Sequence, residues 1–133
     1  MAEEVKSYAL LGDVGGTNIR LELVELSTTS KGPISTLKKS NLNVADHDLF
    51  ANSIRSFLEG VPQIPSVAVV GIAGPIFDNT VSLANVPKWG TLIGDELAKD
   101  LNIPSFRFIN DFEAASYGLL LLEKEDFISL NGL

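Results

Sequence analysis

A continuous apolar run, Val67-Ala68-Val69-Val70, most restricts the fold of this chain. A strand that faces water on one side alternates apolar and polar residues, whereas a strand covered on both faces reads as an unbroken β-branched run. Gly71 and then Gly74-Pro75 follow the run and stop the strand. The run therefore predicts a central strand of a sheet that is covered on both sides.

Other segments supply the remaining elements of such a sheet. Ile19, Leu21 and Leu23 alternate with residues 20, 22 and 24, which predicts a half-buried strand, and further strands are expected at 8–11, 34–42 and 106–109. Helical spacing predicts a helix that Asp46 caps and that ends before Gly60, a second through Ile93, Leu97 and Leu101 to about Asn102, and a third over 111–122. Three strands followed by alternating helices and strands predict one α/β domain, a mixed five-stranded sheet with flanking helices.

The composition excludes several classes of protein. The 133 residues are 45% hydrophobic and carry a formal net charge of −7, and lysines and arginines form no cluster, so a nucleic-acid partner is not expected. The chain has no cysteine and one histidine, His47, which we expect to be solvated. Disulfides and multi-histidine metal sites are thereby excluded. The sequence shows no secretory signal and no long apolar run, so we expect a soluble, cytosolic protein without membrane contact.

A glycine-rich turn, Gly12-Asp13-Val14-Gly15-Gly16-Thr17-Asn18, separates the first two predicted strands and favours an antiparallel hairpin. Adjacent glycines allow positive φ and close approach of a ligand, and successive backbone N–H groups form a concave anion site. Thr17 and Asn18 add side-chain donors, and Asp13 is suited to Mg²⁺ beside a phosphate. The turn is neither a Walker A loop nor Gly-x-Gly-x-x-Gly. A hairpin turn without a ligand is the alternative.

A polar pair, Asn110-Asp111, follows the strand that Ile109 closes. Ligands of open α/β sheets bind at the carboxyl ends of strands. A sugar hydroxyl that attacks the γ-phosphoryl group of ATP must lose its proton, and Asp111 is placed to accept it as general base. Asn110 is suited to hydrogen bonds with neighbouring hydroxyls. Because Asp111 also begins the last predicted helix, a capping role stays open.

Two further segments carry weaker signals. Residues 71–75 are typical of a simple turn at the end of a strand. The segment from Asn85 to Trp89 could face a sugar. The alternative for Trp89 is a place in the core, where a buried tryptophan is usually found.

Four segments in order resemble the bacterial-type glucokinase family, within the sugar kinases that share the actin-like ATPase (ribonuclease H-like) fold. They are LGDVGGTNIR at 11–20, GIAGPI at 71–76, LANVPKW at 83–89 and FINDFEAASYG at 108–118. The resemblance covers about residues 8–122. Phe112 favours the glucokinase branch, because the related repressor-and-kinase group usually has alanine after Asn-Asp.

The resemblance implies ATP and Mg²⁺ as cofactors and glucose as the substrate. The residues that it assigns to the first phosphate motif are Asp13, Gly15, Gly16, Thr17 and Asn18, with Asp13 facing the magnesium. It implies that Asn110 and Asp111 bind the hexose, with Asp111 as catalytic base toward the 6-hydroxyl, and it places Asn85 near the sugar cleft.

Kinases of this family continue with a second phosphate segment, a glutamate-and-histidine sugar motif and an adenine pocket, which these residues lack. We therefore expect 1–133 to be the N-terminal small domain of a two-domain enzyme, with little turnover by itself. Apolar residues at 119–122 and 128–130 would then face the missing half, and a homodimer of the full-length enzyme is compatible with this. A kinase for mannose or an N-acetylhexosamine, a sugar-sensing regulator of the same fold, another phosphoryl donor and a non-enzymatic interaction module are the alternatives.

Overall fold

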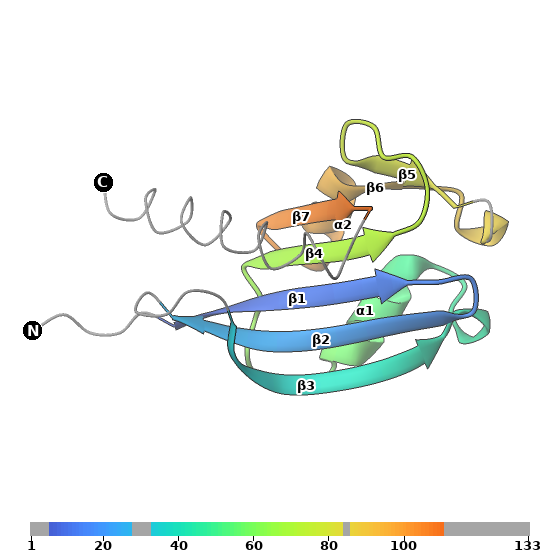
Figure 1. Ribbon diagram of the computed structural model, residues 1–133. Helices are drawn as coiled ribbons and strands as arrows, with labels where there is room; N and C mark the ends of the chain where they lie inside the picture. Colours follow the sequence, from blue (N-terminus) through green and yellow to red (C-terminus); the bar gives the residue numbers. More distant parts are fainter. Residues whose placement is uncertain (1–5, 28–32, 84–85, 111–133) are drawn as a thin grey trace, which may run out of the picture.

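The centre of the computed structural model, which describes residues 6–27, 33–83 and 86–110, is a five-stranded sheet (Figure 1). Its strands are β1 (Lys6–Val14), β2 (Asn18–Ser27), β3 (Pro33–Asn43), β4 (Val67–Ile72) and β7 (Ser105–Ile109). Their order in space is β3-β2-β1-β4-β7. β2 is antiparallel to β1 and β3, whereas β4 is parallel to β1 and β7. The mixed five-stranded sheet predicted from the sequence is confirmed.

The unbroken apolar run forms most of β4, which lies between β1 and β7. All six residues of β4 are buried. Ala68 and Val70 belong to the larger apolar cluster on one face of the sheet, and Val67 and Val69 belong to a smaller cluster on the other face. The prediction of a central strand covered on both faces is therefore confirmed.

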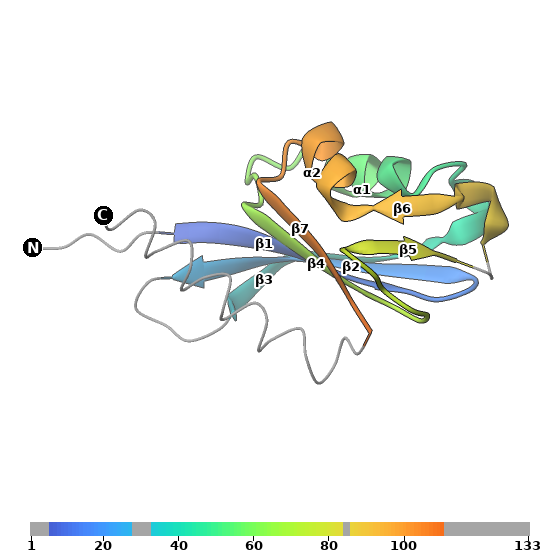
Figure 2. The same cartoon turned by 90° about the horizontal axis from the view of Figure 1, so that it is seen from above.

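Two helices and a small two-stranded ribbon cover one face of the sheet (Figure 2). They are α1 (Phe50–Leu58), α2 (Gly94–Leu101), β5 (Thr80–Ser82) and β6 (Thr91–Ile93), with the 3₁₀ turns η1 (Val44–Asp46) and η2 (Pro87–Trp89). Phe50 anchors this layer, because its ring centroid lies 5.4 Å from that of Trp89 and 6.4 Å from that of Phe106. Neither helix of the described ranges has the length and apolar character needed to cross a membrane.

Two predicted helix starts differ from the structure. Asp46 does not cap α1 but ends η1, which Asn43 caps by accepting a hydrogen bond of 3.0 Å from the backbone N–H of Ala45. α1 itself starts without a side-chain cap. Ile93 is not part of α2, because it pairs with Thr80 as the last residue of β6.

The other end of α2 agrees with the sequence. Asn102 adopts the left-handed conformation, with φ 57°, and its N–H reaches the carbonyls of Ala98 and Lys99. The short strands β5 and β6 were not predicted. The helix predicted at 111–122 lies outside the described residues.

Candidate functional site

The β1–β2 loop, taken as residues 15–17 together with Asn18, the first residue of β2, is held in place by the hairpin and by η1. The backbone N–H of Gly15 donates to the carbonyl oxygen of Asn18 at 2.8 Å, and the N–H of Val44 donates to the carbonyl oxygen of Thr17 at 2.9 Å. Asn18 Nδ2 also donates to Thr17 Oγ1 at 3.1 Å. All four loop residues are exposed. The loop is therefore fixed while its outer surface stays accessible.

Two successive backbone donors of this loop are available to a ligand. The N–H groups of Gly16 and Thr17 make no hydrogen bond with another residue of the described ranges. Successive unpaired N–H groups in a turn are the usual elements of an anion-binding site.

The glycines of the loop are not explained by backbone conformation. Neither Gly15 nor Gly16 lies in the left-handed region, so the expected use of positive φ is wrong. A Cβ built on Gly15 meets only the carbonyl oxygen of Asn18, at 3.6 Å, which is an ordinary contact. The part of the chain that the structure describes thus has room for a side chain at position 15. The close approach of a ligand therefore explains the glycine better than the fold does.

Asp13 lies beside the loop in a row of residues that crosses the sheet. It is opposite Arg20 on β2 and Gly71 on β4, and Arg20 is opposite Asn41 on β3. Arg20 Nη2 donates to Asp13 Oδ2 at 2.9 Å. The side chain of Arg20 is 68% exposed and that of Asp13 is 34% exposed, so water screens the ion pair, which contributes about 1 kcal/mol or less.

A hollow of about 510 Å³ joins this row to the loop. The residues that line it are Asp13, Gly15, Thr17, Asn18, Arg20 and Asn41. Sequence reasoning missed Arg20 and Asn41 as members of the site. The hairpin register was the available signal for Arg20, because a four-residue loop after Val14 places Arg20 opposite Asp13.

The single carboxylate of this hollow fits a magnesium ion that arrives with a nucleotide. Across the described ranges, no three side chains of histidine, cysteine, aspartate or glutamate gather in a way that could hold a metal ion. Mg²⁺ usually keeps several waters and is bound by one or two carboxylates together with phosphate oxygens. Asp13 therefore has the chemistry to hold Mg²⁺ directly or through its waters.

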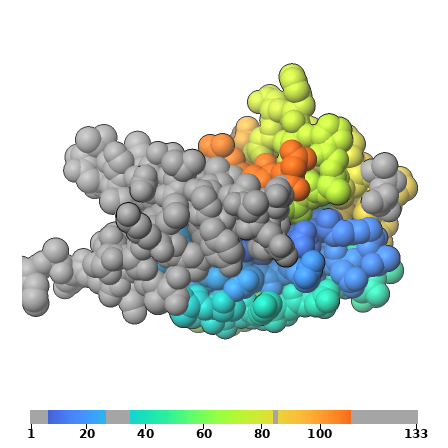
Figure 3. Space-filling view, viewed as in Figure 1, coloured from blue at the N-terminus to red at the C-terminus, as the bar shows by residue number. Residues whose placement is uncertain are grey.

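Asn110 follows β7 directly and is tied to the segment after β4. Its Nδ2 donates to the carbonyl oxygen of Gly74, which has φ 127°, a value that favours glycine. In Figure 3 the orange end of β7 lies against the yellow-green segment that follows β4. The proposed base Asp111 and the weaker candidate Asn85 lie outside the described residues.

A second hollow, of about 330 Å³, adjoins the other side of the loop. Its lining residues are Gly16, Thr17, Asn43, Val44, Ala45, Val86, Pro87 and Lys88. Lys88 Nζ donates to the carbonyl oxygen of Val44, and Trp89 Nε1 donates to that of His47, each at 3.1 Å, so η2 is tied to η1 and its surroundings. Trp89 is 5% exposed and belongs to the core, and His47 is half-buried rather than fully solvated.

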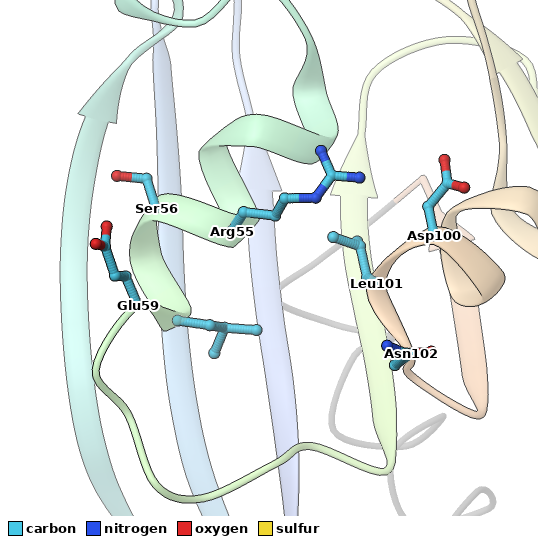
Figure 4. A pocket seen from close by; sticks show the side chains of 7 residues that line it. Arg55, Ser56, Glu59, Asp100, Leu101 and Asn102 are labelled. Atoms are coloured by element: carbon cyan, nitrogen blue, oxygen red, sulfur yellow. The ribbon is translucent and has the colours of Figure 1, made fainter.

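A third hollow, of about 620 Å³, lies between the last turns of α1 and α2 (Figure 4). Arg55 and Glu59 line it from α1 and from the residue after α1, and Asp100 lines it from α2. Both helices end at the edge of the sheet where β4 and β7 begin, whereas the 15–18 loop lies at the edge where β1 ends. This hollow is therefore separate from the candidate site.

Comparison with known proteins gives consistent matches. A family model described as Glucokinase matches residues 10–133. A curated glucokinase of Nostoc sp. (strain PCC 7120) is 35% identical over 123 residues, which are 91% of this chain and 35% of that protein. The glucokinase of Synechocystis sp. is 38% identical over 129 residues, covering 91% of this chain and 36% of the relative. The chain thus spans about a third of the length of these relatives.

Solved structures agree with this pattern. The crystal structure of a glucokinase from an Antarctic psychrotroph matches with a TM-score of 0.68 and 30% identity, over 80% of this chain and 33% of that one. The ROK hexokinase of Thermus thermophilus matches in fold, with a TM-score of 0.55 and 21% identity, over 84% of this chain and 37% of that one. The actin-like ATPase fold expected from the sequence is confirmed.

Proposed function

Because this chain belongs to the glucokinase family, as the match over residues 10–133 shows, we propose that it is the N-terminal small domain of an ATP-dependent glucose kinase. The full-length enzyme transfers the γ-phosphoryl group of ATP to the 6-hydroxyl of glucose and forms glucose 6-phosphate and ADP. The observation that carries the proposal is the hollow in which Asp13 and Arg20 meet the exposed donors of the 15–18 loop.

In this proposal the loop binds the phosphates of the nucleotide. The backbone N–H groups of Gly16 and Thr17 donate to phosphate oxygens, and the absence of a side chain at Gly15 lets the phosphates come close. Mg²⁺, when bound, supplies neutralisation of charge on the phosphates. Asp13 holds the ion or its waters, and Arg20 both orients Asp13 and adds positive charge to the hollow.

The sugar binds at the carboxyl end of β7. Asp111 accepts the proton of the 6-hydroxyl as that oxygen attacks the γ-phosphoryl group. The bond from Asn110 Nδ2 to Gly74 orients the amide of Asn110, and its Oδ1 is then available to accept from another hydroxyl of the sugar. Asn85 is a further contact to the sugar in this proposal.

The remaining contacts come from a second domain, because the chain spans about a third of its curated relatives. Phosphoryl transfer requires the acceptor and donor to be held in line, so the 133-residue chain alone has little turnover. We place the full-length enzyme in the cytoplasm, where ATP is available. A homodimer is compatible with the proposal.

The test is Asp111→Asn in the full-length enzyme. Removing a general base lowers kcat by about 10²- to 10⁴-fold. The Michaelis constant for glucose should change little, because asparagine keeps the shape and hydrogen-bonding capacity of the side chain. The matched control is Asp100→Asn, an exposed carboxylate in the last turn of α2, which should leave kcat unchanged. Wild-type turnover in Asp111→Asn would exclude Asp111 as the base.

A further inference from the structure

A tight turn before β5 places one asparagine between three elements. Asp78 and Asn79 are its central residues, with φ 53° and 56°, and its ends Phe77 and Thr80 exchange two backbone hydrogen bonds of 3.0 Å. Two central residues with positive φ are typical of a type I′ turn, which favours asparagine, aspartate and glycine. The turn therefore explains the backbone of Asn79 but not its side chain.

The side chain of Asn79 pairs with the outer edge of β7. Its Nδ2 donates to the carbonyl oxygen of Phe106 at 2.6 Å, and its Oδ1 accepts from the backbone N–H of Phe108 at 2.9 Å. In the part of the chain that the structure describes, β7 is the last strand on its side of the sheet, so these two groups are among those that a further strand would bind. One amide side chain thus acts in place of a neighbouring strand.

The start of α2 is built closely around the same residue. The N–H of Gly94 donates to the carbonyl oxygen of Asn79 at 2.9 Å. A Cβ on Gly94 would lie 2.2 Å from Asn79 Nδ2 and 2.9 Å from the carbonyl oxygen of Phe106, distances that real Cβ atoms do not reach. Only glycine at position 94 leaves room for the amide of Asn79 against β7.

We propose that Asn79 is a positioning residue for the sugar side of the site, an inference that rests on the proposed function. β7 leads directly into Asn110 and Asp111, whereas β5 and β6 flank the segment that includes Asn85 and η2. Asn79 is bonded to β7 by its side chain and is continuous with β5, so it sets the position of the β5–β6 ribbon relative to the strand that precedes Asn110. The 15–18 loop connects β1 and β2, and the hydrogen bonds that hold it do not involve Asn79.

The first test compares two glycine variants of the full-length enzyme. Asn79→Gly keeps the positive φ and removes the two side-chain bonds to β7, together with a longer bond of 3.5 Å from Asn79 Nδ2 to Asp95 Oδ1. We expect the KM for glucose to rise about 10- to 100-fold, as for a misplaced binding group, with little change in the KM for ATP. Asp78→Gly is the matched control, because Asp78 has a similar φ and an exposed side chain that makes no hydrogen bond with another described residue.

A role limited to stability would lower Tm in Asn79→Gly and leave the ratio of the two KM values as in wild type. That ratio, measured at least ten degrees or so below Tm, therefore separates positioning from general destabilisation. If the wild-type enzyme phosphorylates glucose and Asn79→Gly has the same ratio of the two KM values as the wild type, the proposal is overturned.

A second measurement uses the 133-residue chain itself. Trp89, the only tryptophan, lies in the segment between β5 and β6 and is 5% exposed. We expect the acrylamide quenching constant of its fluorescence to rise at least about two-fold in Asn79→Gly, because the segment opens locally more often, and to stay at the wild-type value in Asp78→Gly. Equal quenching in all three proteins counts against positioning. If the full-length protein phosphorylates no hexose, the proposed function fails and the sugar-positioning role of Asn79 fails with it. If hexose is phosphorylated but neither the KM ratio nor the quenching changes in Asn79→Gly, only the inference about Asn79 fails.

Discussion

Gly15→Ala separates what the fold requires at the β1–β2 loop from what the ligand requires. The added Cβ meets only the carbonyl oxygen of Asn18, at 3.6 Å, and residue 15 lies outside the left-handed region. At such a position alanine stabilises a protein by about 0.4–1 kcal/mol, because it reduces the conformational freedom of the unfolded chain. We therefore expect Tm to rise by about 1–5 °C.

Gly15 lines the hollow at Asp13, so in the proposed function an added methyl group lies where the phosphates approach. A phosphate oxygen bound to the N–H of Gly16 lies about 2.7–2.9 Å from that nitrogen, and a methyl on the preceding residue hinders this approach. Loss of one hydrogen bond to a charged group costs about 1.5–3 kcal/mol. Nucleotide binding should therefore weaken about 10- to 150-fold.

Gly94→Ala is the contrasting variant, because its methyl would lie 2.2 Å from Asn79 Nδ2. Forcing extra volume into a filled site costs about 1–3 kcal/mol, so Tm should fall. Thermal melts of the 133-residue chain measure the stability of both variants, and titration calorimetry of the full-length enzyme with a non-hydrolysable ATP analogue measures binding. The reasoning is refuted if Gly15→Ala melts below the wild type, or if it binds the analogue as tightly as the wild type does.

Two further variants, each with a matched control variant, test the ion pair and the core. Arg20→Gln removes an exposed ion pair, so the free energy of unfolding should change by less than about 1 kcal/mol. The KM for ATP should rise, because the variant removes positive charge from the hollow at Asp13. The control Arg55→Gln changes a residue of the hollow in Figure 4 and should leave the KM for ATP unchanged. An equal effect of both variants on the KM would count against Arg20 in the site. Phe50→Ala should destabilise the chain by about 3–5 kcal/mol in denaturant titrations, because Phe50 is 1% exposed and contacts three aromatic rings. Phe77→Ala, at a residue 85% exposed, should change stability by less than about 0.5 kcal/mol.

The parts of the fold that the sequence predicted are those with a clear periodicity. The unbroken run in β4 follows from burial on two faces. The alternation at Ile19, Leu21 and Leu23 follows from burial of the first part of β2 on one face, whereas Val24 and Leu26 belong to the apolar cluster on the other face. β5 and β6 have three residues each, too few to show a period, and their pairing depends on a turn rather than on an apolar pattern. The first helix start was misplaced because Asn43 and Asp46 are both suitable caps, and the 3₁₀ turn that uses Asn43 separates Asp46 from α1.

The candidate site shows the same division. Loop chemistry pointed to residues 13–18, which the fold keeps together because they are contiguous. Arg20 and Asn41 lie beside these residues only because strand register pairs Arg20 with Asp13 and Asn41 with Arg20. Asn79 could not be found from local sequence, because its side-chain partners on β7 are 27 and 29 residues away along the chain. The phosphate and sugar roles proposed for Asp13, Asn85, Asn110 and Asp111 stay predictions.

The formation of glucose 6-phosphate tests the central claim most directly. The full-length protein is incubated with ATP, Mg²⁺ and glucose, and both products are followed by phosphorus NMR, with the 133-residue chain run in parallel. The account predicts that glucose 6-phosphate and ADP appear in equal amounts with the full-length protein and that the chain alone gives little or none. Absence of glucose 6-phosphate with the full-length protein, or robust turnover by the 133-residue chain, would contradict it.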